Sequence, residues 1–347
     1  MKQLIEVLDA MDEPPKSHRP FVRWWWFGGG ITEEEISREM EEMNAKGIGG
    51  VEIQYIYDAL EGSPLESEKK IKWLSEEWID LINFAVEKGN ELGMQVDLTF
   101  GNGWPFGGPY IEKKLASTKS ASYSMPLGSE EEDIEIPLED LVESPENVVS
   151  VLAMELNEES KLTGKFVNLK DHISDNEEFG PTITYHKPAE NWVLFWYFVQ
   201  PTGQQVKRAA PGGSGLVLDH LNREAFHLHA RKIQQAFEQK MGQKYGNHFG
   251  AFFCDSWEVY GENWTAGFLQ KFRKRYGYDL DPYLPAAIQP EAFSYDFAED
   301  SALLSQAVQY DYKKLHGEFI IDEFFSTFAD YCKNVGTKCR GQPYSAP

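Results

Sequence analysis

The sequence predicts an α/β fold of the (β/α)8 barrel type, incomplete in this chain and carrying a β-rich insertion. Three observations support this fold class. Strand-like and helix-like segments alternate at both ends of the chain, polar and aromatic residues collect where the strands end, and the alternation breaks off in the middle.

The first 100 residues contain three predicted strands and two predicted helices. Apart from Arg23, residues 21–27 are β-branched or aromatic, and glycines follow them. A helix is expected next, because Thr32 and Glu35 have capping-box spacing and Gly47 provides a stop. Residues 49–55 then predict a second strand, 73–92 an amphipathic helix, and 94–100 a third strand.

This order is typical of parallel strands joined by crossover helices, which occur in open doubly wound sheets and in closed barrels. Polar or aromatic residues follow every strand, and barrel enzymes place their active sites at those strand ends. We therefore expect the barrel rather than the open sheet.

The middle of the chain has a different pattern. Short β-like runs at 148–154, 182–185 and 192–199 alternate with acidic turn segments. We interpret 1–119 as the first part of the barrel, 120–215 as a β-rich insertion, and 216–347 as its continuation. A separate domain between two others is the alternative.

The α/β alternation resumes after the insertion. Helices are predicted at 223–240, 265–276 and 300–334, and strands at 250–256 and 338–344. Only five barrel strands are counted, so we expect a truncated barrel whose last strand has an unpaired edge.

The charge and the cysteines restrict the class of protein. The net charge is -23, from 33 basic and 56 acidic residues, which disfavours nucleic acid and anionic membranes as partners. Three scattered cysteines fit neither a disulfide framework nor a zinc site. The acidic start does not resemble a signal peptide, and no apolar run approaches the roughly 20 residues of a membrane span. A cytoplasmic protein is expected, unless a leader was removed.

The aromatic content indicates a carbohydrate-binding cleft. Phe, Trp and Tyr make up 14% of the chain, with ten tryptophans. Aromatic faces serve as platforms for the C–H faces of sugar rings. Trp24, Trp26 and Trp104 are therefore candidate substrate-binding residues, although a core role is the alternative for each ring.

Hydrolysis of a glycosidic bond needs two carboxyl groups that flank the anomeric carbon. Glu258 directly follows the buried strand predicted at 250–256, and is the candidate catalytic residue. We expect its neighbour Trp257 to exclude water and raise the pKa of Glu258, as suits a general acid. A helix cap or an arginine ion pair is the alternative role.

Other polar residues near the strand ends are candidates for binding sugar hydroxyls. Glu262, four residues beyond Glu258, is a candidate ligand for a hard cation such as Ca2+. The candidate substrate-binding residues, besides the three tryptophans, are Glu52, Gln54, Asp97, Asn102, Asp255 and His220.

Six segments together resemble the catalytic module of glycoside hydrolase family 106, the bacterial α-L-rhamnosidases. They occur in that family's order over nearly the whole chain. The segments are WWWFGGGITEE, GIGGVEIQ, LGMQVDLTFGNGWPFGGPYI, FFCDSWEV, FRKRYGYDLDPYLPA and KCRGQPYSAP.

The resemblance implies an inverting, exo-acting α-L-rhamnosidase with a TIM-barrel catalytic domain and a calcium ion at the active site. On that basis Glu258 matches the general acid, and the general base is expected on a later strand, beyond residue 347. We therefore expect this polypeptide alone to lack normal turnover. A non-catalytic carbohydrate-binding protein and a barrel glycosidase acting on another sugar are the alternatives.

Overall fold

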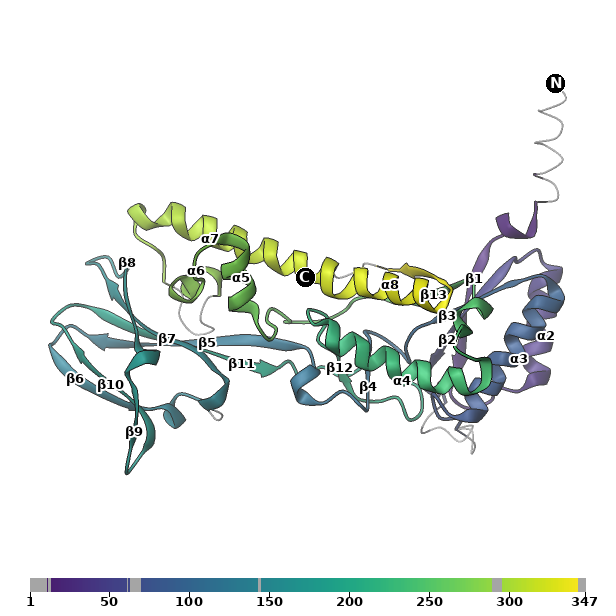
Figure 1. Ribbon diagram of the computed structural model, residues 1–347, viewed down its shortest axis with the longest axis horizontal. Helices are drawn as coiled ribbons and strands as arrows, with labels where there is room; N and C mark the ends of the chain where they lie inside the picture. Colours follow the sequence, from purple (N-terminus) through teal and green to yellow (C-terminus); the bar gives the residue numbers. More distant parts are fainter. Residues whose placement is uncertain are drawn as a thin grey trace, which may run out of the picture. The chain divides into compact units, whose positions relative to one another are not determined.

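The computed structural model describes residues 11, 14–60, 62, 70–142, 145–288 and 295–342. The chain divides into two compact units (Figure 1). Unit 1 comprises Met1–Ser117, Gly203–Tyr260 and Asp322–Pro347, and unit 2 comprises Thr118–Thr202 and Gly261–Ile321. Among the described helices, none is long and apolar enough to cross a membrane.

A five-stranded parallel sheet organises unit 1, with the strand order β1-β2-β3-β13-β14. The described strands leave the sheet open, with β1 and β14 at its two ends. The parallel α/β architecture is thus confirmed, whereas closure into a barrel is not seen. The strands are β1 (Phe21–Phe27), β2 (Gly50–Ile56), β3 (Gln95–Thr99), β13 (Ala251–Cys254) and β14 (Lys338–Gly341), with a small antiparallel pair of β4 (Gly107–Gly108) and β12 (Leu216–Val217).

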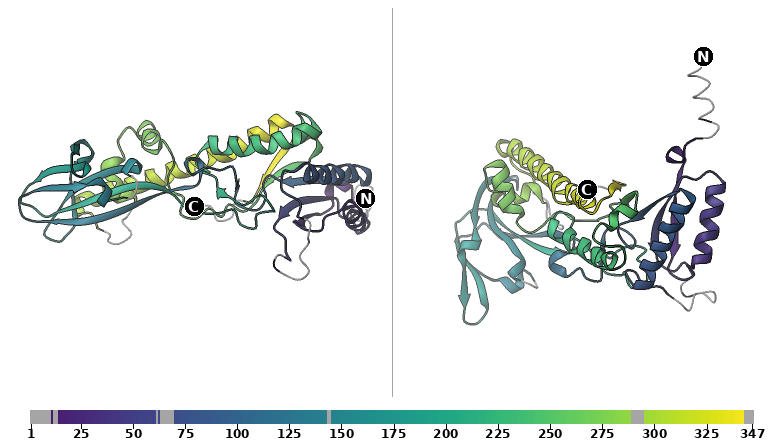
Figure 2. Two further views of the ribbon diagram at one scale, coloured as in Figure 1. Left: turned by 90° about the horizontal axis from the view of Figure 1, so that it is seen from below. Right: turned by 45° about the vertical axis from the view of Figure 1, so that its right-hand side comes forward.

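One face of this sheet is covered by helices, and Figure 2 shows two of them, in purple and blue, side by side. Alternate residues of the strands point into this layer and form a continuous apolar core with the helices. These helices are α2 (Glu33–Ala45), α3 (Glu76–Leu92), α4 (Arg223–Met241) and α8 (Ser326–Val335).

Local sequence signals fix the ends of the first helices. The Thr32 side chain accepts a hydrogen bond from the Glu35 N–H at 3.2 Å, which confirms the predicted N-cap of α2. Helix α3 starts at Glu76 rather than at residue 73, because Ser75 caps it. Gly93 ends α3 in the left-handed conformation, with φ of 64°.

Unit 2 contains two antiparallel sheets. The β-like runs predicted between residues 120 and 215 are strands here, and helices of residues 261–321 belong to the same compact unit. The larger sheet has the order β5-β11-β7-β8 and the smaller one β6-β10-β9. The strands are β5 (Thr118–Gly128), β6 (Glu132–Pro137), β7 (Val148–Leu156), β8 (Leu162–Asn168), β9 (Ile173–Asn176), β10 (Gly180–Lys187) and β11 (Trp192–Pro201).

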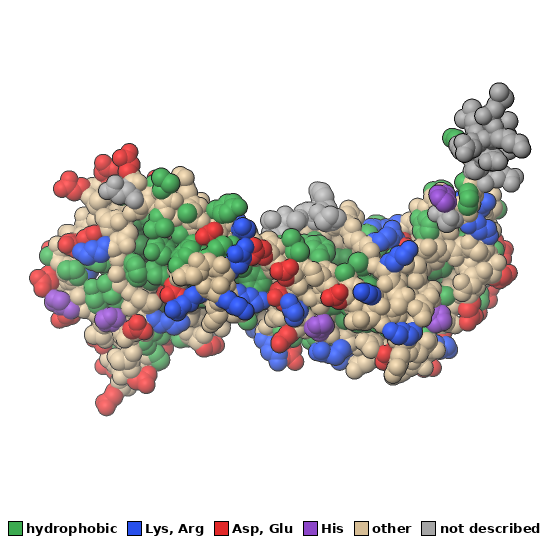
Figure 3. All heavy atoms as spheres, turned by 45° about the horizontal axis from the view of Figure 1, so that its top comes forward, with side chains coloured by type: hydrophobic (Ala, Val, Ile, Leu, Met, Phe, Trp, Pro, Cys, Tyr) green, Lys and Arg blue, Asp and Glu red, His purple; other side chains and the backbone are tan. Residues whose placement is uncertain are grey.

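The helical part of unit 2 consists of α5 (Phe268–Tyr276), α6 (Leu284–Ala287) and α7 (Glu299–Phe319). A π-helical segment, Ile320–Phe325, continues α7 into α8. Hydrophobic side chains are exposed over these helices in Figure 3, and the most exposed are Leu303 and Tyr310, at 80% and 65%.

Candidate functional site

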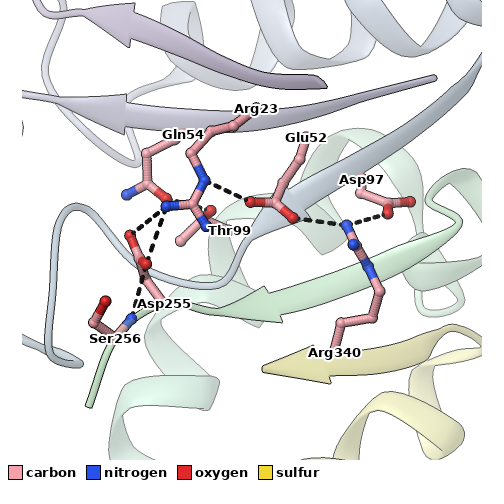
Figure 4. Close-up of polar contacts among 8 residues, drawn as sticks. All are labelled: Arg23, Glu52, Gln54, Asp97, Thr99, Asp255, Ser256 and Arg340. Carbon is pink, nitrogen blue, oxygen red and sulfur yellow. Dashed lines mark hydrogen bonds and ion pairs between the residues drawn. The ribbon is translucent and has the colours of Figure 1, made fainter. Parts of the chain in front are cut away.

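The face of the parallel sheet opposite those helices carries an ion-pair network, shown in Figure 4. Arg23 of β1 donates to Glu52 of β2 at 3.1 Å and to Asp255, just after β13, at 3.1 Å. Arg340 of β14 donates to Glu52 at 2.7 Å and to Asp97 of β3 at 2.6 Å. Three predicted substrate-binding carboxylates therefore lie together, joined by two arginines.

These carboxylates are nearly inaccessible to water. The side chains of Glu52, Asp97 and Asp255 are 7%, 1% and 4% exposed. Burial raises the pKa of both Glu52 and Asp97, while the arginines act in the opposite direction. Because each carboxylate has an arginine partner, the network compensates buried charge before any substrate arrives.

The aromatic ring of Phe253 lies beneath both arginines. The guanidinium carbon of Arg23 is 4.7 Å from the ring centroid and that of Arg340 is 5.5 Å away. Next to the network, the Thr99 hydroxyl donates to the Gln54 side-chain oxygen at 2.5 Å, and both residues are buried. Gln54 is thus part of the packed sheet face.

Glu258 lies in the loop after β13, and its side chain is 19% exposed. The Lys207 ammonium donates to its Oε2 at 2.5 Å, and the Tyr260 hydroxyl donates to the same oxygen at 3.0 Å. The Gln204 amide donates to the Glu258 carbonyl and accepts from the Tyr260 N–H, at 2.5 and 2.8 Å. Lys207 and Tyr260 therefore hold the carboxylate, and Gln204 holds the backbone of residues 258–260.

The environment of Glu258 corrects one expectation. The Lys207 hydrogen bond, assisted by Tyr260 and Trp104, holds the pKa of the Glu258 carboxyl below its usual value, although partial burial opposes this. Trp257 does not raise this pKa, because its ring is buried against His220 and Phe324. Glu258 is consequently ionised at neutral pH in the unliganded protein.

The loop that carries Trp104 and the loop that carries Lys207 contact each other through their backbones. The N–H of Trp104 donates to the Lys207 carbonyl at 3.1 Å, and the reverse hydrogen bond is 2.7 Å long. A Cβ atom built at Gly103, Gly107 or Gly215 would lie 2.2 to 2.3 Å from backbone atoms of the facing segment. We call these three positions the glycine seam; only residues without a side chain allow this approach.

The predicted tryptophans of β1 lie on the helix-covered side of the sheet. Trp24 and Trp26 are 8% and 3% exposed and pack in the helix-covered core, on the face opposite to the carboxylates. Trp25 points the other way, is 43% exposed, and lies 6.5 Å from Trp104 between ring centroids. Trp104 interacts with the Glu258 carboxyl, and Trp25 is the tryptophan of β1 that lies next to Trp104.

Two further candidates are enclosed. His220 is 1% exposed and packs against Trp257 and Phe324, and burial lowers its pKa to about 3. The ring lies inside the protein in the unliganded structure, so its contact with a sugar hydroxyl stays a prediction. Asn102 is also 1% exposed, and its amide has no hydrogen-bond partner among the described residues.

The predicted cation ligand, Glu262, is 4% exposed and belongs to unit 2. Among the described residues, no group of three or more His, Cys, Asp or Glu side chains is arranged to hold a metal ion. The three carboxylates Glu52, Asp97 and Asp255 are paired with two arginines, Arg23 and Arg340. Calcium binding through Glu262 stays a prediction.

Sequence patterns alone did not predict five residues of the site: Arg23, Trp25, Lys207, Tyr260 and Arg340. Arg23 and Trp25 alternate with Trp24 and Trp26, so choosing the other face of β1 would have found them. Lys207 is far from Glu258 in sequence, and no local pattern connects the two.

Comparisons with known proteins identify the family of this chain. The chain matches the sequence profile of glycoside hydrolase family 106, described as alpha-L-rhamnosidase, over residues 12–129 and 153–344. It is 24% identical over 380 residues to a Formosa agariphila protein named "Putative beta-glucuronidase", covering 99% of this chain and 31% of that protein.

The solved structure of a rhamnosidase from Novosphingobium sp. PP1Y has the same fold, with a TM-score of 0.71 and 16% sequence identity. That match covers 96% of this chain and 47% of the rhamnosidase chain. The chain thus spans less than half of the length of either relative.

Proposed function

Since the chain belongs to glycoside hydrolase family 106, we propose that it forms part of the catalytic module of an inverting, exo-acting α-L-rhamnosidase. Its parallel sheet and covering helices would then be part of a TIM barrel that encloses the polar sheet face. The substrate would be a terminal rhamnosyl unit of a glycoside or oligosaccharide.

The observation that carries this proposal is the position of Glu258. It follows a buried parallel strand, its side chain is partly exposed, and Trp104 interacts with it, with Trp25 next to Trp104. The carboxylates of the network, Glu52, Asp97 and Asp255, are buried and form ion pairs with arginines. Glu258 is thus the carboxylate of this face best placed to reach a glycosidic oxygen.

The role of general acid requires a protonated carboxyl at the moment of bond cleavage. In the unliganded protein, Lys207 and Tyr260 stabilise the ionised form. We propose that the leaving-group sugar displaces Lys207 from Glu258, which removes the cation and favours protonation. Inversion then needs a second carboxylate, on the opposite side of the sugar, to activate water.

The first experiment measures release of rhamnose from p-nitrophenyl α-L-rhamnoside and from unactivated rhamnosides. It compares this chain with a polypeptide that extends it to the length of its relatives. We expect hydrolysis by the extended form, and loss of roughly 10²–10⁴-fold on unactivated rhamnosides in Glu258→Gln, with substrate binding retained. Unchanged turnover in that variant would rule out the acid role.

The exposed Glu224 in the first turn of α4 provides a matched control. Glu224→Gln removes the same charge from the same unit and should leave turnover unchanged. The proposed calcium requirement rests on the resemblance alone, and parallel assays with calcium and with a chelator test it.

A glycosidase acting on another sugar is the second candidate, because one relative is named as a beta-glucuronidase. A panel of aryl glycosides that includes the β-D-glucuronide separates the two. Cleavage of another glycoside, with no activity on the rhamnoside, would keep the assignment to glycosidases and replace the substrate.

A further inference from the structure

Four aromatic rings form a row beside the carboxyl ends of β1 and β2. Successive ring centroids are 6.5 Å apart from Trp104 to Trp25, 6.2 Å from Trp25 to Phe27, and 6.1 Å from Phe27 to Tyr57. Trp25 and Phe27 are 43% and 38% exposed. We call these four residues the aromatic row; its two central rings offer apolar surface that the protein leaves open.

One end of the aromatic row adjoins the proposed acid. Trp104 is joined through its backbone to Lys207, and Lys207 holds the carboxylate of Glu258. A saccharide lying along the row from this end would therefore have its cleaved bond near Glu258. The row then contacts the sugars of the leaving group.

The other end of the aromatic row is cationic. The guanidinium of Arg208 lies over the Tyr57 ring, 4.9 Å from its centroid, and its side chain is exposed. Among the described residues, no carboxylate forms an ion pair with Arg208. The Arg208 guanidinium is therefore available to an anionic group of a ligand.

A pocket of about 350 Å³ adjoins this end. Its lining includes Tyr57, Lys70, Lys72 and Ser214. One carboxylate, Asp58, also lines it, but that residue is 6% exposed and accepts a hydrogen bond from the Leu60 N–H at 3.0 Å.

The backbone holds Arg208 in place. Its φ is 56°, a left-handed conformation that costs free energy in a residue with a side chain. Its carbonyl accepts the N–H of Tyr57 at 3.1 Å, directly after β2. This hydrogen bond fixes the turn that directs the guanidinium over the tyrosine ring.

We propose that the aromatic row binds the leaving-group sugars and that Arg208, with the adjoining lysine-lined pocket, selects a sugar that carries a carboxylate. Sugar C–H faces stack on the open rings, and a guanidinium recognises a carboxylate through charge-assisted hydrogen bonds. The inference rests on the proposed function as a glycosidase. It adds the substrate class, a saccharide with a uronate unit next to the released sugar.

The test measures binding of this chain to p-nitrophenyl β-D-glucuronide and p-nitrophenyl β-D-glucoside by calorimetry at low and high salt. The two ligands differ only at C6, where the glucuronide has a carboxylate and the glucoside a hydroxymethyl group. The glucuronide should therefore bind about fivefold more tightly at low salt, and the difference in affinity should shrink as salt is added. Arg208→Gln should abolish that difference. Trp25→Ala should weaken both ligands by similar factors.

Arg231→Gln is the matched control, because it removes an exposed arginine from α4 in the same unit. It should preserve the preference for the glucuronide. Equal affinity for both ligands, or a preference unchanged in Arg208→Gln, would overturn the inference. Equally tight binding of the 6-sulfated glucoside would overturn the assignment to carboxylates.

Binding needs no turnover, so the two proposals fail separately. Absence of hydrolysis in the extended enzyme would count against the proposed glycosidase activity. Hydrolysis without a binding preference for the glucuronide would count only against the proposal that Arg208 selects a carboxylate.

Discussion

The two faces of the parallel sheet in unit 1 differ in chemistry, although the same strands form both: one face is apolar and the other carries ion pairs. On the helix-covered face, Trp24, Trp26 and Ile53 join an apolar core. On the other face, Arg23 and Glu52, neighbours of those residues in sequence, belong to the ion-pair network. Since side chains alternate along a strand, one residue of register separates packing from polar chemistry.

The comparison shows how each face tolerates burial. The apolar face loses little by leaving water, whereas the polar face needs a partner for every charge. Its carboxylates have those partners in two arginines from the outermost strands, β1 and β14. The polar face therefore depends on the whole width of the sheet being assembled.

The largest expected effect contrasts adjacent tryptophans on the two faces. Trp26→Ala leaves a cavity in the core and should lower the free energy of unfolding by about 4 kcal/mol. Trp25→Ala removes a ring that is 43% exposed and should cost about 1 kcal/mol. Denaturant titration measures both, and equal losses would show that the two faces are packed alike.

A smaller loss is expected from breaking the polar face. Arg23→Met leaves Asp255 without its arginine and Glu52 with Arg340 alone, and should destabilise the protein by about 3 kcal/mol. Combining it with Glu52→Gln and Asp255→Asn should restore part of that loss, because the unpaired charges are removed. If the triple variant is less stable than Arg23→Met, the ion pairs are not the cause.

The smallest effect concerns the pH dependence of stability. Burial lowers the pKa of His220 to about 3 and that of His229 to about 4, below the usual value of about 6.5. Each histidine must stay neutral in the folded protein. Its stabilisation is present above pH of about 6.5 and is lost as pH falls, by about 1.4 kcal/mol per pH unit.

Glu52 changes the pH dependence of stability in the opposite direction to the two histidines. Because its folded pKa is raised, the folded state takes up this proton more readily as pH falls, which offsets part of the histidine effect. His220→Phe should flatten the fall in unfolding free energy between pH 6 and pH 4, whereas the exposed His248→Gln should leave it unchanged. An unchanged slope in His220→Phe would show that this ring is not the buried neutral group.

Local sequence patterns predicted the order and type of the elements of the sheet. Alternation and glycine stops located β1, β2, α2 and α3 within a few residues, since those signals lie inside each element. The final strand ends at Gly341 among the described residues, and the end predicted at residue 344 lies outside them. Closure of the barrel stays a proposal, because it depends on pairing between strands distant in sequence.

The candidate site was less predictable. Proximity of Glu52, Asp97 and Asp255 could be inferred, because residues at equivalent places on parallel strands lie side by side. The lowered pKa of Glu258 could not, because Lys207 comes from a loop fifty-one positions earlier in the chain. The face occupied by Trp24 was ambiguous, since alternation gives two sets of residues but not which set the helices cover.

The glycine seam sets where variation can enter this site. In a mutational scan that measures folding, many residues should be tolerated at Trp25 and Tyr260, because their exposed side chains can change without moving the backbone. The same scan should reject nearly every residue at Gly103, Gly107 and Gly215, because even alanine would separate the two loops. Changes in substrate preference should therefore arise from substitutions of exposed side chains such as Trp25 and Tyr260. The spacing between Trp104 and Lys207 should stay the same.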